Sequence, residues 1–168
     1  MTEGKDSSSS KVQLGAEPLV LKRLEVELGV ELEHQRRVDL DDSWVRPDGA
    51  APDGSVFVEI LARIGKLKGG QERKVSMDAL KLLGLREFHP KAKLVLAFVD
   101  QQAADSIVGW KAALLERQGI ERRVVEIGPR YRALISEAQA RQDLFTADDP
   151  VSPTLPRNPS PAPRQRRR

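Results

Sequence analysis

Val56-Phe-Val-Glu-Ile-Leu61 and Lys93-Leu-Val-Leu-Ala-Phe-Val99 are the two stretches of sequence that decide the fold. The first follows the turn-rich segment 49–54, and its pattern predicts a strand that returns antiparallel from that turn. The second is almost continuously apolar, as expected of a strand that is buried on both faces. A helical pattern over 71–85 lies between them. A strand, a helix and a strand of these lengths predict a right-handed parallel crossover.

The segments on either side of this unit are predicted from hydrophobic period and from helix start and stop signals. Pro18 suits the first turn of a helix that stops at Gly29, and an alternating pattern over 30–40 predicts a strand. Toward the C-terminus we expect a helix over 101–118, a strand over 122–127 and a final helix that carries Leu134, Ile135 and Ala138. The expected class is α/β, with a mixed β-sheet flanked by helices.

The composition changes at both ends of the chain. Residues 1–12 are rich in serine, and residues 146–168 hold six of the eleven prolines and five arginines, so we expect disordered tails there. One domain is expected between them, over 13–145. The C-terminal segment also holds two aspartates, and its balance of +3 accounts for the net charge of +3 of the whole chain. The rest of the chain therefore has no net charge, and a basic surface on the domain would require basic residues to cluster on one part of it.

Composition excludes several classes of site. The chain has no cysteine, which excludes disulfides, thiolate zinc sites, iron–sulfur clusters and a cysteine nucleophile. With His34 and His89 as its two histidines, a histidine-rich metal site is not expected. No stretch approaches the roughly 20 consecutive apolar residues of a membrane span, and the N-terminus lacks the apolar region of a secretory signal. We therefore expect a cytoplasmic protein with no membrane partner.

Two acidic residues stand out near the first strand. Asp48 ends one predicted strand, and Glu59 lies inside the next, on the same face as Phe57 and Leu61. An acid between apolar neighbours is costly to bury unless a metal ion or a lysine offsets its charge. Carboxylates on adjacent strands supply the oxygen ligands that Mg²⁺ prefers. A strand face turned toward solvent would also explain Glu59.

The helix that follows carries a polar stripe at the edge of its apolar face. At about 100° per residue, Gln71, Lys74, Asp78 and Lys81 fall on one side of the helix. Such a stripe can look toward the sheet edge where Asp48 is expected. An ordinary solvated face with i,i+3 and i,i+4 ion pairs explains the same spacing.

These residues resemble the motif of the PD-(D/E)XK nuclease superfamily. The resemblance rests on the Pro47-Asp48 step, on Glu59 in an apolar strand after ten intervening residues, and on the helix that follows. The chain is similar to a small group of bacterial members in the stretch Val56-Phe-Val-Glu59 and in the residues that follow it: Gly65, Lys68, Gln71, Lys74-Val75 and Asp78-Ala-Leu-Lys-Leu82. The order of the elements over 17–145 also resembles the restriction-endonuclease-like core, α-β-β-β-α-β with an added α-β-α.

The resemblance implies a metal-dependent nuclease that cleaves phosphodiester bonds. Asp48 and Glu59 would hold Mg²⁺ or Mn²⁺, and Gln71 would orient a water or a phosphate oxygen. The family lysine two residues after the acid is replaced by Leu61, so Lys74 is the candidate for a migrated lysine, with Lys68 and then Lys66 behind it. Such a lysine would position the water or stabilise the developing oxyanion. Asp78 is expected to pair with Lys74 rather than to bind metal.

The partner that the resemblance implies is nucleic acid, with DNA favoured over RNA, and a homodimer is left open. A second interpretation is a catalytically inactive nuclease-like domain that binds nucleic acid or a protein partner. A third is an unrelated α/β domain whose acids are ordinary surface groups. The positions of the carboxylates and lysines in space separate the three.

Overall fold

A computed structural model of the chain describes residues 8–147, and its side chains over 15–141. The first helix begins at Ser8 and the last ends at Ala147, so both extend past the expected domain limits of 13 and 145. The expected tails at 1–7 and 148–168 lie outside the described residues. No helix in the described part of the chain is long and apolar enough to cross a membrane.

The secondary structure alternates between helices and strands around one main sheet. The helices are α1 (Ser8–Leu28), α2 (Gly69–Phe88), α3 (Gln101–Asp105), α4 (Gly109–Arg117) and α5 (Pro129–Ala147). The strands are β1 (Glu33–His34), β2 (Val38–Leu40), β3 (Ser43–Val45), β4 (Gly49–Ala50), β5 (Val56–Leu61), β6 (Lys93–Phe98) and β7 (Ile120–Val124). The main sheet has the order β1-β4-β5-β6-β7, and β2 and β3 form a separate hairpin.

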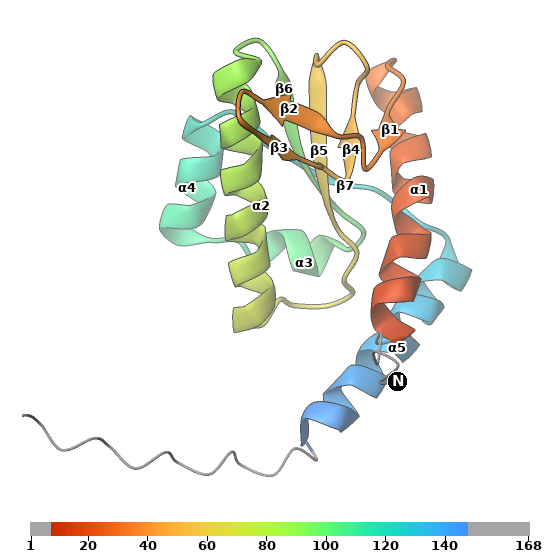
Figure 1. Cartoon of the computed structure of the whole chain (residues 1–168). Helices are drawn as coiled ribbons and strands as arrows, with labels where there is room; N and C mark the ends of the chain where they lie inside the picture. Colours follow the sequence, from red (N-terminus) through yellow and green to blue (C-terminus); the bar gives the residue numbers. More distant parts are fainter. Residues whose placement is uncertain (1–7, 148–168) are drawn as a thin grey trace, which may run out of the picture.

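The sheet is mixed, as the sequence predicts. β4 pairs with β5 antiparallel, whereas β5, β6 and β7 are parallel neighbours. In Figure 1, α1 and α5 cover one side of the sheet and α2 and α4 cover the other. Each side chain of β5 is buried, and successive residues point to opposite faces. Val58 belongs to the core cluster beneath α1 and α5, and Phe57 belongs to the cluster beneath α2, α3 and α4.

The prediction of one strand over 30–40 is wrong. Gln35 adopts a left-handed backbone conformation with φ of 49°, which ends β1 and turns the chain into β2. Val38, Leu40 and Val45 then pack over the α2 side of the core, so the hairpin lies across that face instead of extending the sheet. The placement of Pro18 in a first turn is also wrong, because Pro18 lies inside α1.

The prediction of one helix over 101–118 is wrong as well. The chain leaves the helical path after Asp105, buries Ile107 and restarts at Gly109, whose φ of +63° favours glycine. The last strand runs over Ile120–Val124 instead of 122–127, and it begins directly after Gly119, whose φ is +60°. By contrast, the α2 helix and the buried strands β5 and β6 are confirmed close to their expected limits.

Candidate functional site

Asp48 and Glu59 lie side by side where β4 meets β5. The antiparallel register sets Gly49 opposite Val58 and Ala50 opposite Phe57, and extending it by one residue before β4 would set Asp48 opposite Glu59. In that register both side chains would lie on the sheet face covered by α2, from which Lys81 reaches Glu59. Asp48 Oδ2 also accepts a hydrogen bond of 2.7 Å from the backbone N–H of Ile60, which fixes its carboxylate at the end of β5.

Glu59 is a fully buried carboxyl group. Its side chain is 1% exposed, and Oε2 accepts a hydrogen bond of 2.8 Å from Lys81 Nζ, which reaches it from α2. The second oxygen, Oε1, is buried without a hydrogen-bond partner. Burial raises the pKa of Glu59 to about 8, and the charge of Asp48 adds to this shift although Lys81 opposes it. The prediction that Glu59 shares a face with Phe57 is confirmed.

A second acid–lysine pair lies one helical turn from the first. Lys74 Nζ donates to Asp78 Oδ2 at 2.6 Å, and the Asp78 side chain is 8% exposed. Burial raises the pKa of Asp78, and Lys74 opposes that shift. Burial acts to lower the pKa of Lys74, but Asp78, Asp48 and Glu59 outweigh it and the net shift is upward. The expected Lys74–Asp78 pair is therefore present, on a helix face that looks inward.

The remaining predicted residues lie at the start of α2. Gln71 Oε1 accepts a hydrogen bond of 2.8 Å from the backbone N–H of Lys68, which caps the N-terminus of the helix. Gln71 and Lys74 both line a cavity of about 220 Å³ at the end of β5. The side chains of Lys68 and Lys66 are exposed and do not line this cavity.

Two residues of the site were not predicted from the sequence as functional. Glu17 of α1 lines the same cavity, and His34 Nε2 lies 2.8 Å from its Oε2. Burial raises the pKa of Glu17, and the charge of Asp48 adds to that shift. Lys81 is the other residue. It belongs to the predicted polar stripe, so a helical-wheel argument could have found it, whereas Glu17 lies in another element and carries no local signal.

The loop from β5 into α2 is held by the side chain of one residue of α5 and by that of one residue that follows β6. Gln139 of α5 bonds both backbone groups of Ile64, accepting at 2.8 Å and donating at 3.0 Å. Asp100, which follows β6, accepts from the backbone N–H of Gly65 at 2.9 Å and from Arg132 at 2.5 Å. These bonds fix the point at which the chain leaves the sheet. They thereby position the first turns of α2 and the side chain of Lys74.

The donor set fits one divalent cation with few protein ligands. Asp48 and Glu59 offer carboxylate oxygens, and the buried Glu59 Oε1 is an acceptor that a cation would satisfy. Mg²⁺ is commonly held by one or two carboxylates, with water and substrate phosphate completing its shell. Among residues 15–141, no group of three or more acidic or histidine side chains is arranged to hold a metal ion. A metal site proposed here would therefore have these two carboxylates as its protein ligands.

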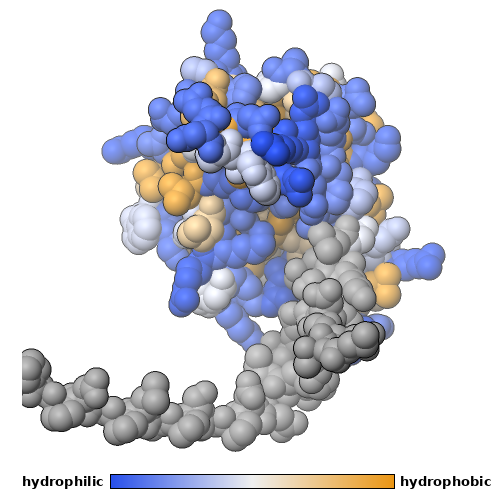
Figure 2. All heavy atoms as spheres, viewed as in Figure 1, coloured by the Kyte–Doolittle hydropathy of each residue, from blue (hydrophilic) through white to orange (hydrophobic). Residues whose placement is uncertain are grey.

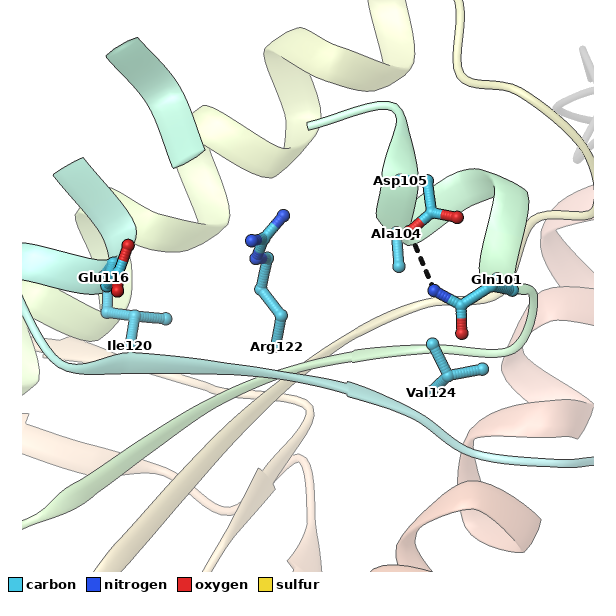
Figure 3. Close-up of a pocket in the computed structure, with 7 residues that line it drawn as sticks. All are labelled: Gln101, Ala104, Asp105, Glu116, Ile120, Arg122 and Val124. Atoms are coloured by element: carbon cyan, nitrogen blue, oxygen red, sulfur yellow. Dashed lines mark hydrogen bonds between the residues drawn. The ribbon is translucent and has the colours of Figure 1, made fainter. Parts of the chain in front are cut away.

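A larger cavity, of about 560 Å³, lies at the opposite edge of the sheet. Figure 3 shows Arg122 rising from β7 between Glu116 of α4 and Asp105 of α3. The Arg122 guanidinium donates to the backbone carbonyl of Ile107 at 3.0 Å. β6 separates this cavity from β5, so it belongs to a different part of the molecule from Asp48.

Comparison with known proteins gives no relative on which to base a function: no family model, no curated protein and no solved structure matches this chain.

Proposed function

We propose that this protein is a metal-dependent nuclease that cleaves phosphodiester bonds of nucleic acid, with DNA favoured as substrate, and that its α/β sheet has the restriction-endonuclease-like arrangement. The observation that carries the proposal is that Asp48, held by the backbone N–H of Ile60, lies near enough to Glu59 to raise its pKa, and that Glu59 is buried with one oxygen unpartnered. Burying Glu59 close to a second acid is costly. A site that binds a cation explains why the chain carries this cost.

In this proposal Asp48 and Glu59 hold Mg²⁺ or Mn²⁺. When bound, the cation supplies a water of lowered pKa and neutralises charge on the scissile phosphate. The backbone N–H of Ile60 holds Asp48 in place. The ammonium group of Lys81 opposes the upward shift in the pKa of Glu59 and so favours its ionised form, which binds metal better than the protonated carboxyl does.

Two lysines of α2 take the place of the family lysine, whose position in this chain is occupied by Leu61. Leu61 is buried in the core cluster beneath α2, so no cation is supplied from its position. Lys74 lines the cavity at the end of β5 and is half exposed, which suits a donor to a phosphate oxygen. Lys81 contacts Glu59 directly. Lys74 thus stabilises the developing charge on the substrate, and Lys81 favours the ionised form of the metal ligand.

A second candidate function is a catalytically inactive nuclease-like domain that binds nucleic acid or a protein. One observation favours it: each lysine already pairs with an acid, Lys81 with Glu59 and Lys74 with Asp78. Acids and lysines that neutralise one another can form an ion-pair network that serves the structure alone, in a domain that carries out no reaction on a substrate.

Cleavage assays separate the two functions. Linear duplex DNA, single-stranded DNA and RNA are incubated with the protein in Mg²⁺ or Mn²⁺, beside the variants Glu59→Gln and Glu87→Gln. Glu87 is an exposed acid on α2 and serves as the matched control. We expect metal-dependent cleavage that falls by at least about 100-fold in Glu59→Gln and is unchanged in Glu87→Gln. Absence of cleavage with every substrate, or cleavage unchanged in Glu59→Gln, would favour the inactive domain.

A further inference from the structure

An exposed cluster of Arg37, Trp44 and Arg46, here called the Arg–Trp platform, lies on the β2–β3 hairpin. The guanidinium carbons of Arg37 and Arg46 lie 5.3 Å and 5.0 Å from the centroid of the Trp44 ring. Trp44 is 51% exposed, so much of its ring surface is open to a partner. Nothing in the proposed chemistry at Glu59 uses these residues.

The hairpin presents the platform outward. Val38 and Val45 face each other in the hairpin register and pack on the core beneath α2. The next pair, Asp39 opposite Trp44, therefore points to the other face, toward solvent. Asp39 accepts a hydrogen bond of 2.7 Å from Arg37 Nε, which holds that guanidinium beside the ring. This bond restricts the Arg37 side chain before any partner binds, which lowers the entropy cost of binding through that residue.

Charge is segregated along the hairpin. The acids Asp41 and Asp42 occupy its exposed tip, whereas Arg37 and Arg46 lie at its open end. Among the described residues, no carboxylate lies within ion-pair distance of Arg46, whose recorded contact is with the Trp44 ring. Figure 2 shows that this view of the molecule is largely hydrophilic, with apolar side chains in separate places. An apolar partner surface is therefore a poor match for this face.

The open end of the hairpin leads directly to the metal-binding acids. Trp44 and Asp48 are four residues apart, so their Cα atoms lie within about 14 Å of each other. A strand of nucleic acid with a phosphate at Asp48 would place neighbouring nucleotides at the hairpin. Guanidinium groups suit phosphate oxygens, and an exposed aromatic ring beside them suits an unpaired base.

We propose that the Arg–Trp platform binds a single-stranded segment of nucleic acid next to the site of Asp48 and Glu59. Arg37 and Arg46 contact phosphates, and Trp44 stacks against an unpaired base. This inference rests on the proposed function for its choice of partner, because it takes nucleic acid as the ligand of the neighbouring acids. It extends that function by naming a strand-binding surface and a single-stranded substrate form.

Binding without cleavage tests the inference. The full chain is titrated into fluorescein-labelled single-stranded DNA of mixed sequence in EDTA, and anisotropy is recorded at several salt concentrations. We expect Trp44→Ala to weaken binding roughly tenfold. Arg46→Ala should also weaken it, and should reduce the slope of log affinity against log salt by roughly 0.7. Matched duplex DNA should be affected less, because its bases are already stacked.

Controls come from α4, on another part of the surface. Trp110 is 71% exposed there, and Arg117 is exposed at the end of the same helix. Trp110→Ala and Arg117→Ala should bind single-stranded DNA like the wild type, and circular dichroism should show all variants folded. Equal affinity of Trp44→Ala and wild type, or an equal loss in Trp110→Ala, would overturn the inference.

The two proposals fail in different ways. A chain that binds single-stranded DNA through the platform in EDTA but cleaves nothing in Mg²⁺ would refute the nuclease and keep this inference. A chain that cleaves through Glu59, with unchanged binding in Trp44→Ala, would refute this inference and keep the nuclease.

Discussion

The two faces of the main sheet differ in whether they bury charged side chains. The face beneath α1 and α5 is filled by apolar side chains such as Val58 and Ile60 of β5. The opposite face, beneath α2, receives Glu59 from the same strand and Asp78 from the helix, both buried. Because alternate residues of one strand supply both faces, backbone structure alone does not account for the difference. Charge is buried where lysines of α2 are in reach, and that is the face on which we place the site.

Introducing a charge on the apolar face should have the largest effect on stability. Val58→Glu would bury a carboxyl group among α1 and α5 side chains, since Val58 is 0% exposed. We expect a loss of roughly 3–5 kcal/mol in the free energy of unfolding, the cost of an uncompensated buried charge. Urea denaturation followed by circular dichroism measures it. Val26→Glu is the matched control at a position that is 85% exposed, and its stability should stay within about 0.5 kcal/mol of wild type.

The charged face should make stability depend on pH. The pKa of Glu59 is raised from 4.5 to about 8 in the folded chain. The folded state therefore binds more protons than the unfolded state between these values, and stability falls as pH rises through that window. We expect wild type to lose roughly 2–4 kcal/mol relative to Glu59→Gln between about pH 5 and about pH 9.

Urea denaturation of both proteins in EDTA at these pH values measures the difference. Comparing the two proteins removes the contribution of other titrating groups, because only Glu59 differs. A constant difference across the range would show that Glu59 has an ordinary pKa and is not buried as described.

Removing the lysine partner should have a smaller effect on stability. Lys81→Met leaves Glu59 buried without its cation, and we expect a loss of roughly 1–3 kcal/mol at neutral pH, because Glu59 can take up a proton instead. The loss should grow with pH. The double variant Lys81→Met with Glu59→Leu should recover most of it, since an apolar pair replaces the ion pair. Lys91→Met, an exposed lysine outside α2, is the control. Equal stability of Lys81→Met and wild type at high pH would contradict the account.

Local patterns in the sequence predict the strands and the helix that form the charged face of the sheet. Continuous apolar runs locate β5 and β6, and the alternation within β5 correctly places Glu59 with Phe57. The 3.6-residue period places Lys81 on the inward stripe of α2. The period does not determine which lysine reaches Glu59, because that depends on the position of α2 along the strands of the sheet. That register is set by bonds between distant residues, such as Gln139 to the loop at Ile64.

The irregular parts depend on single residues whose backbone conformation departs from the local pattern. Gln35 in a left-handed conformation divides the expected strand over 30–40, although its neighbours alternate as a strand should. Gly109 likewise restarts a helix where the composition favours continuation. Glu17 joins the site only because α1 packs beside the end of β5, an arrangement that no pattern within α1 encodes.

The central claim, that Asp48 and Glu59 together hold a divalent cation, is tested most directly by metal binding in the absence of substrate. Mn²⁺ is titrated into the wild-type chain and into Asp48→Asn, Glu59→Gln and Glu87→Gln at about pH 8, where Glu59 is substantially ionised, with free Mn²⁺ followed by electron paramagnetic resonance. The account predicts one bound ion per chain in wild type and in Glu87→Gln, and loss of that ion in the other two variants. Absence of binding in wild type, or equal binding in all four proteins, would contradict it.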